Sequence, residues 1–406
     1  MLMNKTICIV GALDTKGEEF AFLKAEIEKR GFKTLVVDTG VMGSPLFMPD
    51  VSREHVADAG GTSLEELVEQ ADRGTAMAVM TSGTAEIVRR LYADGKINGI
   101  IGMGGGGGTV IATSAMRGLP IGFPKVMVST VASGDVSAYV GTSDITMMPS
   151  VVDVAGINRI SRVIYVNAAG AICGMVGGEI PTGEVKPIIA ATMFGNTTRA
   201  VNHAKEIFES AGYEVLVFHA TGTGGRTMES LVDAGYIEGV LDITTTEWAD
   251  EICGGVLTAG PTRLDAAGRT GIPQIVVPGC LDMCNFWARN TVPEKYQGRL
   301  LYEWNPNITL MRTTPEENAQ MGHIFAEKLN AATGPTLVYI PRGGWSELDY
   351  PEKPFWWPEA NDAFVQALKA DLRSDIPVIE MSEDINHPNF SSTVANRLLE
   401  LLKERA

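Results

Sequence analysis

Five consecutive glycines, Gly104–Gly108, form the densest chemical signal in the chain. The apolar run Ile97–Met103 before them predicts a buried strand, and Thr109–Met116 after them predicts a helix. Glycine permits positive φ and close approach of the backbone, and the first turn of a helix has free N–H groups. We therefore expect the amides of Thr109–Ala112 to hold a phosphate, and the Thr109 hydroxyl to donate to that phosphate or to help hold a metal ion. The expected cradle consists of Gly104, Gly105, Gly106, Gly107, Gly108 and Thr109. The alternative is a close helix–sheet contact or a flexible loop.

The segment Asp14-Thr15-Lys16-Gly17 leaves the first predicted strand, Thr6–Val10, and precedes a predicted helix. Lys16 could meet a phosphate as a point charge, and Asp14 and Thr15 would contact the same nucleotide. The alternative for Asp14 is a helix N-cap.

A third loop, Thr81–Thr84, precedes a helix predicted over residues 85–94. Its residues Ser82, Gly83 and Thr84 are candidate anion ligands, and ordinary capping of that helix is the alternative. Asp38 ends the second predicted strand, Thr34–Val37, where an acidic side chain often accepts hydrogen bonds from a ribose.

The stretch Ser129–Asp135 follows a Pro-Lys strand and precedes Gly141-Thr142-Ser143-Asp144. This order resembles the phosphofructokinase plan, in which an aspartate is the general base for the accepting hydroxyl. Asp135 would be the matching residue. The alternative is an inter-domain loop in which Asp135 caps a helix.

The second half of the chain offers Arg342 in Pro341-Arg342-Gly343-Gly344, where its guanidinium could orient a substrate carboxylate or phosphate. Cys280 and Cys284 have poor spacing for zinc, and a buried structural thiol is the expected state of Cys280. His203 and His219 stand singly, so no metal cluster is predicted and the metal is unknown.

Length and composition exclude several classes of protein. The 406 residues carry a formal charge of −16, which argues against a nucleic-acid partner and an anionic membrane. Five cysteines, an odd number, indicate no disulfide framework and favour a reducing cytoplasm. The sequence pattern predicts neither a signal peptide nor a membrane-length apolar run.

The elements that carry these residues repeat along the chain. Residues 5–38 and 186–219 both contain strand, loop, helix, glycine and strand in the same order. We expect an α/β fold of two Rossmann-like, open parallel-sheet domains, with ligands at the carboxyl ends of the strands and in an inter-domain cleft. The predicted domains are residues 1–182, which bind the nucleotide, and residues 183–406, with a hinge at residues 177–185.

Three of these segments together resemble a known family. They are Gly11–Gly17, the glycine run with Thr109, and Pro341–Gly344. The chain resembles the ATP-binding family named after the tomato tobamovirus-resistance protein Tm-one, over the N-terminal region of that protein. The resemblance implies two Rossmann-like subdomains, ATP at the glycine run and a homodimer. It assigns no role to Asp135 or Arg342.

The leading functional hypothesis is an ATP-dependent phosphotransferase acting on a small acidic metabolite. The glycine run, Lys16 and Mg²⁺ would neutralise the phosphates, Asp135 would be the base and Arg342 would orient the substrate. The second hypothesis is a nucleotide-binding regulatory or interaction protein without turnover. A nicotinamide-dependent enzyme is disfavoured, because the first strand–helix loop lacks the dinucleotide fingerprint.

Overall fold

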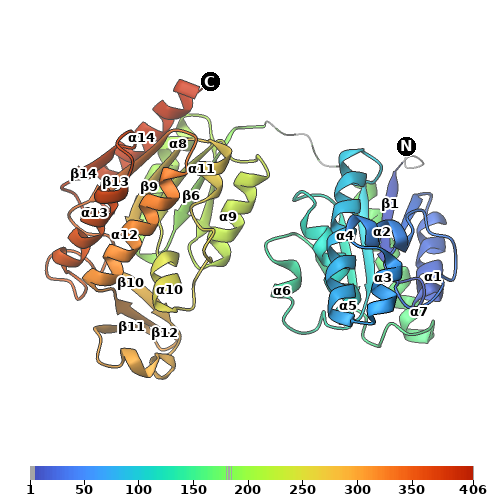
Figure 1. Cartoon of the computed structure of the whole chain (residues 1–406). Helices are drawn as coiled ribbons and strands as arrows, with labels where there is room; N and C mark the ends of the chain where they lie inside the picture. Colours follow the sequence, from blue (N-terminus) through green and yellow to red (C-terminus); the bar gives the residue numbers. More distant parts are fainter. Residues whose placement is uncertain (1–4, 180, 182, 184, 406) are drawn as a thin grey trace. The chain divides into compact units, whose positions relative to one another are not determined.

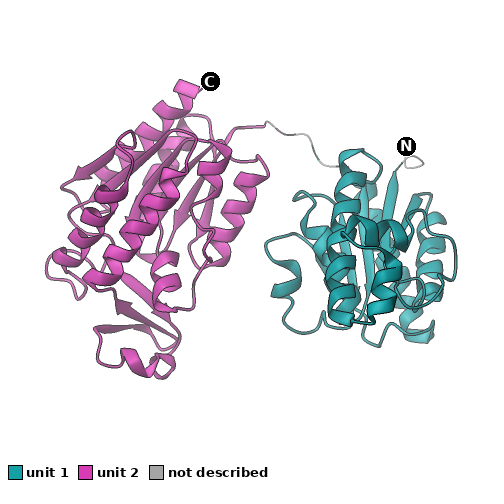
Figure 2. Ribbon diagram, viewed as in Figure 1, with its two compact units in different colours: residues 1–182 teal, residues 183–406 magenta. Residues whose placement is uncertain are grey.

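The computed structural model describes residues 5–179, 181, 183 and 185–405. The chain divides into two compact units, residues 1–182 and residues 183–406 (Figure 2). The predicted hinge at residues 177–185 includes positions 180, 182 and 184, which lie outside the described residues.

Unit 1 is built on a five-stranded parallel sheet in the order β2-β1-β3-β4-β5. Its inner strands are buried apolar runs, as expected when helices cover both faces of a sheet. The strands are β1 (Thr6–Gly11), β2 (Lys33–Asp38), β3 (Gly99–Gly104), β4 (Lys125–Ser129) and β5 (Thr146–Pro149).

Helices cover both faces of this sheet (Figure 1). Helices α1 and α7 share one apolar cluster with the strands, and α2, α3, α4 and α5 share the other. The helices are α1 (Gly17–Glu28), α2 (Arg53–Ala59), α3 (Leu64–Gln70), α4 (Arg73–Ala93), α5 (Gly106–Arg117), α6 (Ser137–Val140) and α7 (Arg159–Gly177).

Helix α7 corrects one expectation from the sequence. Among the described residues it alone is long and apolar enough, by length and composition, to cross a membrane. One side of it is buried in unit 1 through Tyr165, Ala168 and Ile172, which pack against α1 and the sheet. Its apolar character therefore fits a core helix of the α/β unit.

Unit 2 contains a six-stranded parallel sheet in the order β14-β13-β9-β8-β6-β7. With unit 1, this confirms the predicted fold class of two open parallel-sheet domains. The strands are β6 (Ile188–Met193), β7 (Glu214–His219), β8 (Gly239–Thr244), β9 (Gln274–Gly279), β13 (Thr336–Pro341) and β14 (Val378–Met381).

A separate three-stranded antiparallel sheet extends unit 2, in the order β10-β12-β11. The sequence interpretation had no counterpart for it. Its strands are β10 (Met283–Phe286), β11 (Leu301–Asn305) and β12 (Ile308–Arg312). The helices of unit 2 are α8 (Thr198–Ser210), α9 (Thr223–Asp233), α10 (Glu247–Cys253), α11 (Ala266–Thr270), α12 (Pro315–Asn330), α13 (Pro358–Asp371) and α14 (Pro388–Arg405).

The expected helix over residues 85–94 is wrong in its start, because α4 begins twelve residues earlier, at Arg73. Asp72 caps it by accepting a hydrogen bond from the N–H of Thr75 at 2.6 Å. The polar run 81–84 therefore lies inside a helix. A glycine is required there, because a Cβ at Gly83 would stand 1.9 Å from the carbonyl oxygen of Val56 in α2.

Candidate functional site

The glycine run joins the end of β3 directly to α5. Gly105 is the N-cap of α5 and Gly106 is its first helical residue. The N–H groups of Gly106, Gly107 and Gly108 therefore have no acceptor within the helix. The expectation that Thr109–Ala112 supply free amides is wrong, because the Thr109 N–H already donates to the Gly105 carbonyl at 2.9 Å.

Backbone conformation does not explain the glycines, since none of Gly104–Gly108 has positive φ. Packing explains two of them. A Cβ at Gly104 would come within 3.1 Å of the Cα of Gly108, and one at Gly108 within 3.3 Å of the Met103 carbonyl. At Gly105, Gly106 and Gly107, a Cβ would meet no heavy atom closer than 3.5 Å. Packing therefore does not require glycine at these three positions.

The Thr109 hydroxyl is hydrogen-bonded within unit 1. Its Oγ1 donates to the Gly105 carbonyl at 2.8 Å or pairs with the Ser129 hydroxyl at 2.6 Å, and the residue is fully buried. The expected role of Thr109 as a phosphate or metal ligand is therefore corrected: its side chain fastens α5 to β4.

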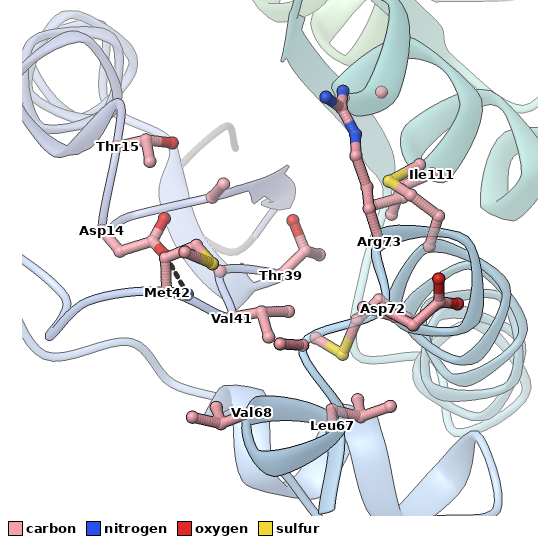
Figure 3. Close-up of a pocket in the computed structure, with 18 residues that line it drawn as sticks. Asp14, Thr15, Thr39, Val41, Met42, Leu67, Val68, Asp72, Arg73 and Ile111 are labelled. Atoms are coloured by element: carbon pink, nitrogen blue, oxygen red, sulfur yellow. Dashed lines mark hydrogen bonds between the residues drawn. The ribbon is translucent and has the colours of Figure 1, made fainter. Parts of the chain in front are cut away.

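A cavity of about 660 Å³ opens beside Gly107 and Gly108, at the carboxyl edge of the sheet. Figure 3 shows Asp14 and Thr15 on one side of it, Arg73 and Ile111 on another, and Leu67 and Val68 on a third. Most of the remaining wall is apolar. The lining residues are Ala12, Asp14, Thr15, Thr39, Gly40, Val41, Met42, Leu67, Val68, Ala71, Asp72, Arg73, Ala76, Met77, Met80, Gly107, Gly108 and Ile111.

Asp14 lies at the cavity, as expected, but it does not cap a helix. Its Oδ2 accepts hydrogen bonds from the N–H groups of Met42 at 2.8 Å and Gly43 at 3.2 Å, which holds the loop after β2 (Figure 3). Its Oδ1 is buried and has no hydrogen-bond partner among the described residues. Thr15 lines the same cavity and is exposed.

Asp38 is fully buried and is not among the lining residues. Its Oδ1 accepts from the N–H groups of Leu13 at 3.0 Å and Gly40 at 2.9 Å, so it joins the loops after β1 and β2. Burial raises its pKa above the ordinary value, and the nearby Asp14 carboxylate adds to the rise. Asp38 therefore supports two loops of the cavity wall from behind. It does not line the cavity, so it does not contact a ribose there directly.

The positive charge at the cavity comes from a residue that sequence reasoning missed. Lys16 donates its Nζ hydrogen bond to the Val154 carbonyl and is not among the lining residues. Arg73, at the start of α4, lines the cavity with an exposed side chain and has no ion-pair or hydrogen-bond partner within the described part of the chain. No motif marks Arg73; only the packing of α4 against α5 places it beside the glycines.

The candidate ligands Ser82, Gly83 and Thr84 lie in the interior of α4, which corrects their expected role. Their N–H groups belong to the helix ladder. The Ser82 hydroxyl donates to the Val79 carbonyl at 3.0 Å, and the Thr84 hydroxyl donates to the Met80 carbonyl at 2.6 Å.

The two remaining predicted catalytic residues lie elsewhere. Asp135 is on the surface of unit 1, where its Oδ1 accepts from the Ser137 N–H at 2.9 Å. That bond lowers the pKa of Asp135. Arg342 is in unit 2, where it pairs with Asp362 at 2.5 Å and Glu380 at 3.4 Å. Neither side chain lines the cavity beside the glycines.

The cysteines and histidines of unit 2 form no reactive centre. Cys280 and Cys284 are fully buried, and burial raises the pKa of the Cys280 thiol well above its ordinary value. The His203 ring lies 2.8 Å from the Ser392 hydroxyl, and the His219 ring stacks on Phe194. Among the described residues, no group of three or more His, Cys, Asp or Glu could hold a metal ion.

Comparisons with known proteins find two domain models of one family that together match nearly the whole chain. Residues 5–181 match the N-terminal domain, and residues 186–402 the C-terminal domain, of an uncharacterised protein family, UPF0261. A UPF0261 protein of Clostridium tetani is 53% identical over 405 residues, covering 99% of this chain and 100% of that protein. One from Rhizobium meliloti is 49% identical over 389 residues, covering 95% of this chain and 96% of that protein.

The tomato ToMV resistance protein Tm-1(GCR237) is 40% identical over 420 residues, covering 98% of this chain and 56% of the tomato protein. Among solved structures, the UDP-N-acetylglucosamine 2-epimerase of Rickettsia bellii aligns over 98% of this chain and 96% of its own, with 10% identity and a TM-score of 0.24. At that TM-score, the likeness carries no functional argument. The resemblance to the tomato protein's family is confirmed by identity over nearly the full chain, and the chain belongs to the UPF0261 family.

Proposed function

We propose that the chain binds ATP in the cavity of unit 1 and uses it for phosphoryl transfer to a small acidic metabolite. One observation carries the proposal: the bare backbone of Gly107 and Gly108, at the start of α5, borders a cavity of about 660 Å³. Free N–H groups at a helix N-terminus favour a phosphate, and an apolar wall favours a base.

Each part of the nucleotide has a counterpart in the cavity wall. The phosphates would meet the N–H groups of Gly106–Gly108 and the unpaired guanidinium of Arg73. The adenine would lie against Val41, Leu67 and Met77, where a methionine side chain adapts to a flat ring.

The donor set also fits Mg²⁺. This cation prefers oxygen ligands and commonly takes one or two carboxylates together with substrate phosphates. The Asp14 Oδ1 atom, buried without a partner at the cavity, is such an oxygen, so Asp14 would hold the ion. When bound, Mg²⁺ would neutralise charge on the transferring phosphate.

A second function, nucleotide binding without turnover, is favoured by the position of the expected base. Asp135 is exposed on a turn, bonded to Ser137, and its pKa is lowered, which weakens it as a proton acceptor. In this alternative the same cavity holds ATP as a regulatory ligand.

The remaining proposals concern where the protein acts. We propose a cytoplasmic homodimer. Its five cysteines are free and buried, which agrees with a reducing compartment.

Calorimetric titration with ATP, ADP and NAD tests the binding proposal. We expect ATP and ADP to bind and NAD not to bind. Replacing Arg73 by Gln should weaken ATP binding by about tenfold, because a charge-assisted bond to phosphate is lost. Arg90→Gln is the matched control on the same helix, where Arg90 pairs with Glu86. NAD binding without ATP binding, or equal affinities in the two variants, would reject the proposal.

Turnover separates the two functions. ADP release in the presence of sugar acids should be stimulated if phosphoryl transfer occurs, and Asp135→Asn should slow it by about 10²-fold if Asp135 is the base. If Asp135→Asn keeps both ATP affinity and rate, that residue has no catalytic role. If no sugar acid stimulates ADP release, binding without turnover becomes the better account.

A further inference from the structure

Unit 2 has a cavity of its own, of about 630 Å³, at the carboxyl edge of its large sheet. Four separate segments form it: the start of α8, the loops after β13 and β14, and the tip of β11. The carboxyl edge of an open parallel sheet is the usual place for a ligand. Its lining residues are Arg199, Trp304, Glu347, Leu348, Tyr350, Lys353, Asp384, Asn386, His387 and Pro388.

Hydrogen bonds between the loops hold this wall in one arrangement. The Asn386 amide donates to the Asn196 carbonyl at 2.8 Å, and its Oδ1 accepts from the Ala200 N–H at 3.3 Å. The Ile385 N–H donates to the Gly344 carbonyl at 3.0 Å. The loops after β6, β13 and β14 are thus tied to one another before any ligand arrives, which lowers the entropic cost of binding.

Donor groups gather in the cavity although the chain as a whole carries a charge of −16. The Arg199 guanidinium lies 3.8 Å from the Glu347 carboxylate, beyond hydrogen-bond distance, and 80% of its side chain is exposed. The Lys353 ammonium stands 5.1 Å above the centre of the Tyr350 ring and has no carboxylate partner in the described residues. Both cations therefore keep their N–H donors for a ligand.

His387 supplies a third donor, and one of the two lining carboxylates accepts a backbone hydrogen bond. The His387 Nδ1 accepts from the Asn389 N–H at 3.2 Å, which leaves the proton of the neutral ring on Nε2. The Asp384 carboxylate accepts from the Asn386 N–H at 2.9 Å. Glu347 is the carboxylate that remains to face Arg199.

Two aromatic rings, Trp304 and Tyr350, complete the wall. Trp304 is 44% exposed, a large apolar surface to leave in water. Flat aromatic faces stack on the rings of sugars and aromatic ligands. We propose that this cavity is a second ligand site, which binds a small ring-bearing anion: a sugar or aromatic ring with a carboxylate or phosphate group.

Tryptophan fluorescence and calorimetry on the full chain test this site with glucose 6-phosphate, glucuronate, benzoate and inorganic phosphate. We expect at least one of the organic anions to bind with a Kd below ~1 mM and to change the tryptophan emission, to which Trp304 contributes. Preference for glucose 6-phosphate over glucuronate and benzoate assigns the anion as phosphate, and the reverse assigns it as carboxylate. Binding should persist with the nucleotide cavity saturated by ATP and in the Arg73→Gln variant.

Variants decide whether the binding occurs in this cavity. Arg199→Gln and Lys353→Gln should each weaken the bound anion by about tenfold. Lys205→Gln, further along α8 in an exposed pair with Glu209, is the matched control and should stay within about twofold. All of these side chains are on the surface, so folding, checked by circular dichroism, should be unchanged. Absence of binding by every organic anion, or equal affinities in Arg199→Gln, Lys353→Gln and Lys205→Gln, would overturn the proposal.

Discussion

The two units differ at one corresponding position on the carboxyl edges of their parallel sheets. Strand β3 makes its last pairing at Gly104 with Ser129 of β4, and β8 makes its last pairing at Thr244 with Gly279 of β9. Three residues further on, unit 1 has Gly107 and unit 2 has Glu247. At this corresponding position on the carboxyl edge of the parallel sheet, unit 1 therefore has no side chain and unit 2 has a carboxylate.

The Glu247 carboxylate lies at the N-terminus of helix α9, where a negative charge is favoured. Its Oε1 accepts from the N–H groups of Gly222 at 2.8 Å and Gly225 at 3.0 Å, at the start of α9. Its Oε2 accepts from Arg263 at 2.6 Å, and Arg263 also binds Asp242 at 2.5 and 2.6 Å. In unit 2, a carboxylate on the helix after β8 thus accepts from the amides at the start of α9, whereas in unit 1 the amides at the start of α5 lie beside an open cavity.

The largest effect should come from Glu247→Ala. The substitution leaves two buried N–H groups without an acceptor and takes one carboxylate from the buried guanidinium of Arg263, which should cost about 3–5 kcal/mol of unfolding free energy. All six tryptophans lie in unit 2, so fluorescence-detected denaturation reports on this unit alone.

Glu247→Gln is the matched control for this variant. The amide oxygen still accepts hydrogen bonds at similar volume, so its loss should be smaller than that of Glu247→Ala. If the denaturation midpoint of Glu247→Ala equals that of the wild-type chain, the Glu247 carboxylate does not stabilise this edge of the sheet.

Gly107→Glu places a carboxylate in unit 1 at the position that corresponds to Glu247 of unit 2. The new carboxylate would occupy the cavity beside the N–H groups of α5 and repel a phosphate, so ATP binding should weaken by at least ~100-fold. A Cβ at Gly107 meets Met77 at an ordinary 3.5 Å, so the unit should still fold. Gly107→Gln adds similar volume without charge and should weaken binding less. Equal ATP affinity in Gly107→Glu and wild type would place the phosphates elsewhere.

Buried carboxylates should also make unit 2 sensitive to pH. Burial raises the pKa of Asp250 from 3.8 to about 7. The folded state then keeps a proton that the unfolded chain releases near pH 4, so unit 2 loses stability as the pH rises from about 4 to about 7. Trp-detected denaturation at pH 5 and pH 8 should show a loss of ~1 kcal/mol or more that Asp250→Asn reduces. An unchanged pH dependence in Asp250→Asn would assign the effect to other groups.

Local patterns predicted the two parallel sheets and the glycine turn, because buried parallel strands are apolar and run directly into their loops. They missed Arg73 because its role depends on α4 packing against α5, which no short motif encodes. They placed Ser82 and Thr84 at a helix start because hydroxyls are typical of caps, although here they bond to the preceding helical turn. The prediction for Asp135 rested on a resemblance in segment order and that for Arg342 on its residue type, and the sequence does not show their surface partners.

The smallest effect distinguishes a ligand from a packing reason for the glycines. Gly106→Ala and Gly107→Ala should each raise the stability of unit 1 by about 0.5–1 kcal/mol, because alanine is the better helix former and neither Cβ meets a close atom. Of these two glycines, Gly107 lines the cavity and Gly106 does not, so only Gly107→Ala should also weaken ATP binding, by several fold. Circular dichroism and calorimetry on both variants give the two quantities. Higher stability together with weaker ATP binding in Gly107→Ala would show that this glycine serves the ligand at the expense of stability. Unchanged ATP affinity in Gly107→Ala would show that the glycine run has a purely structural role.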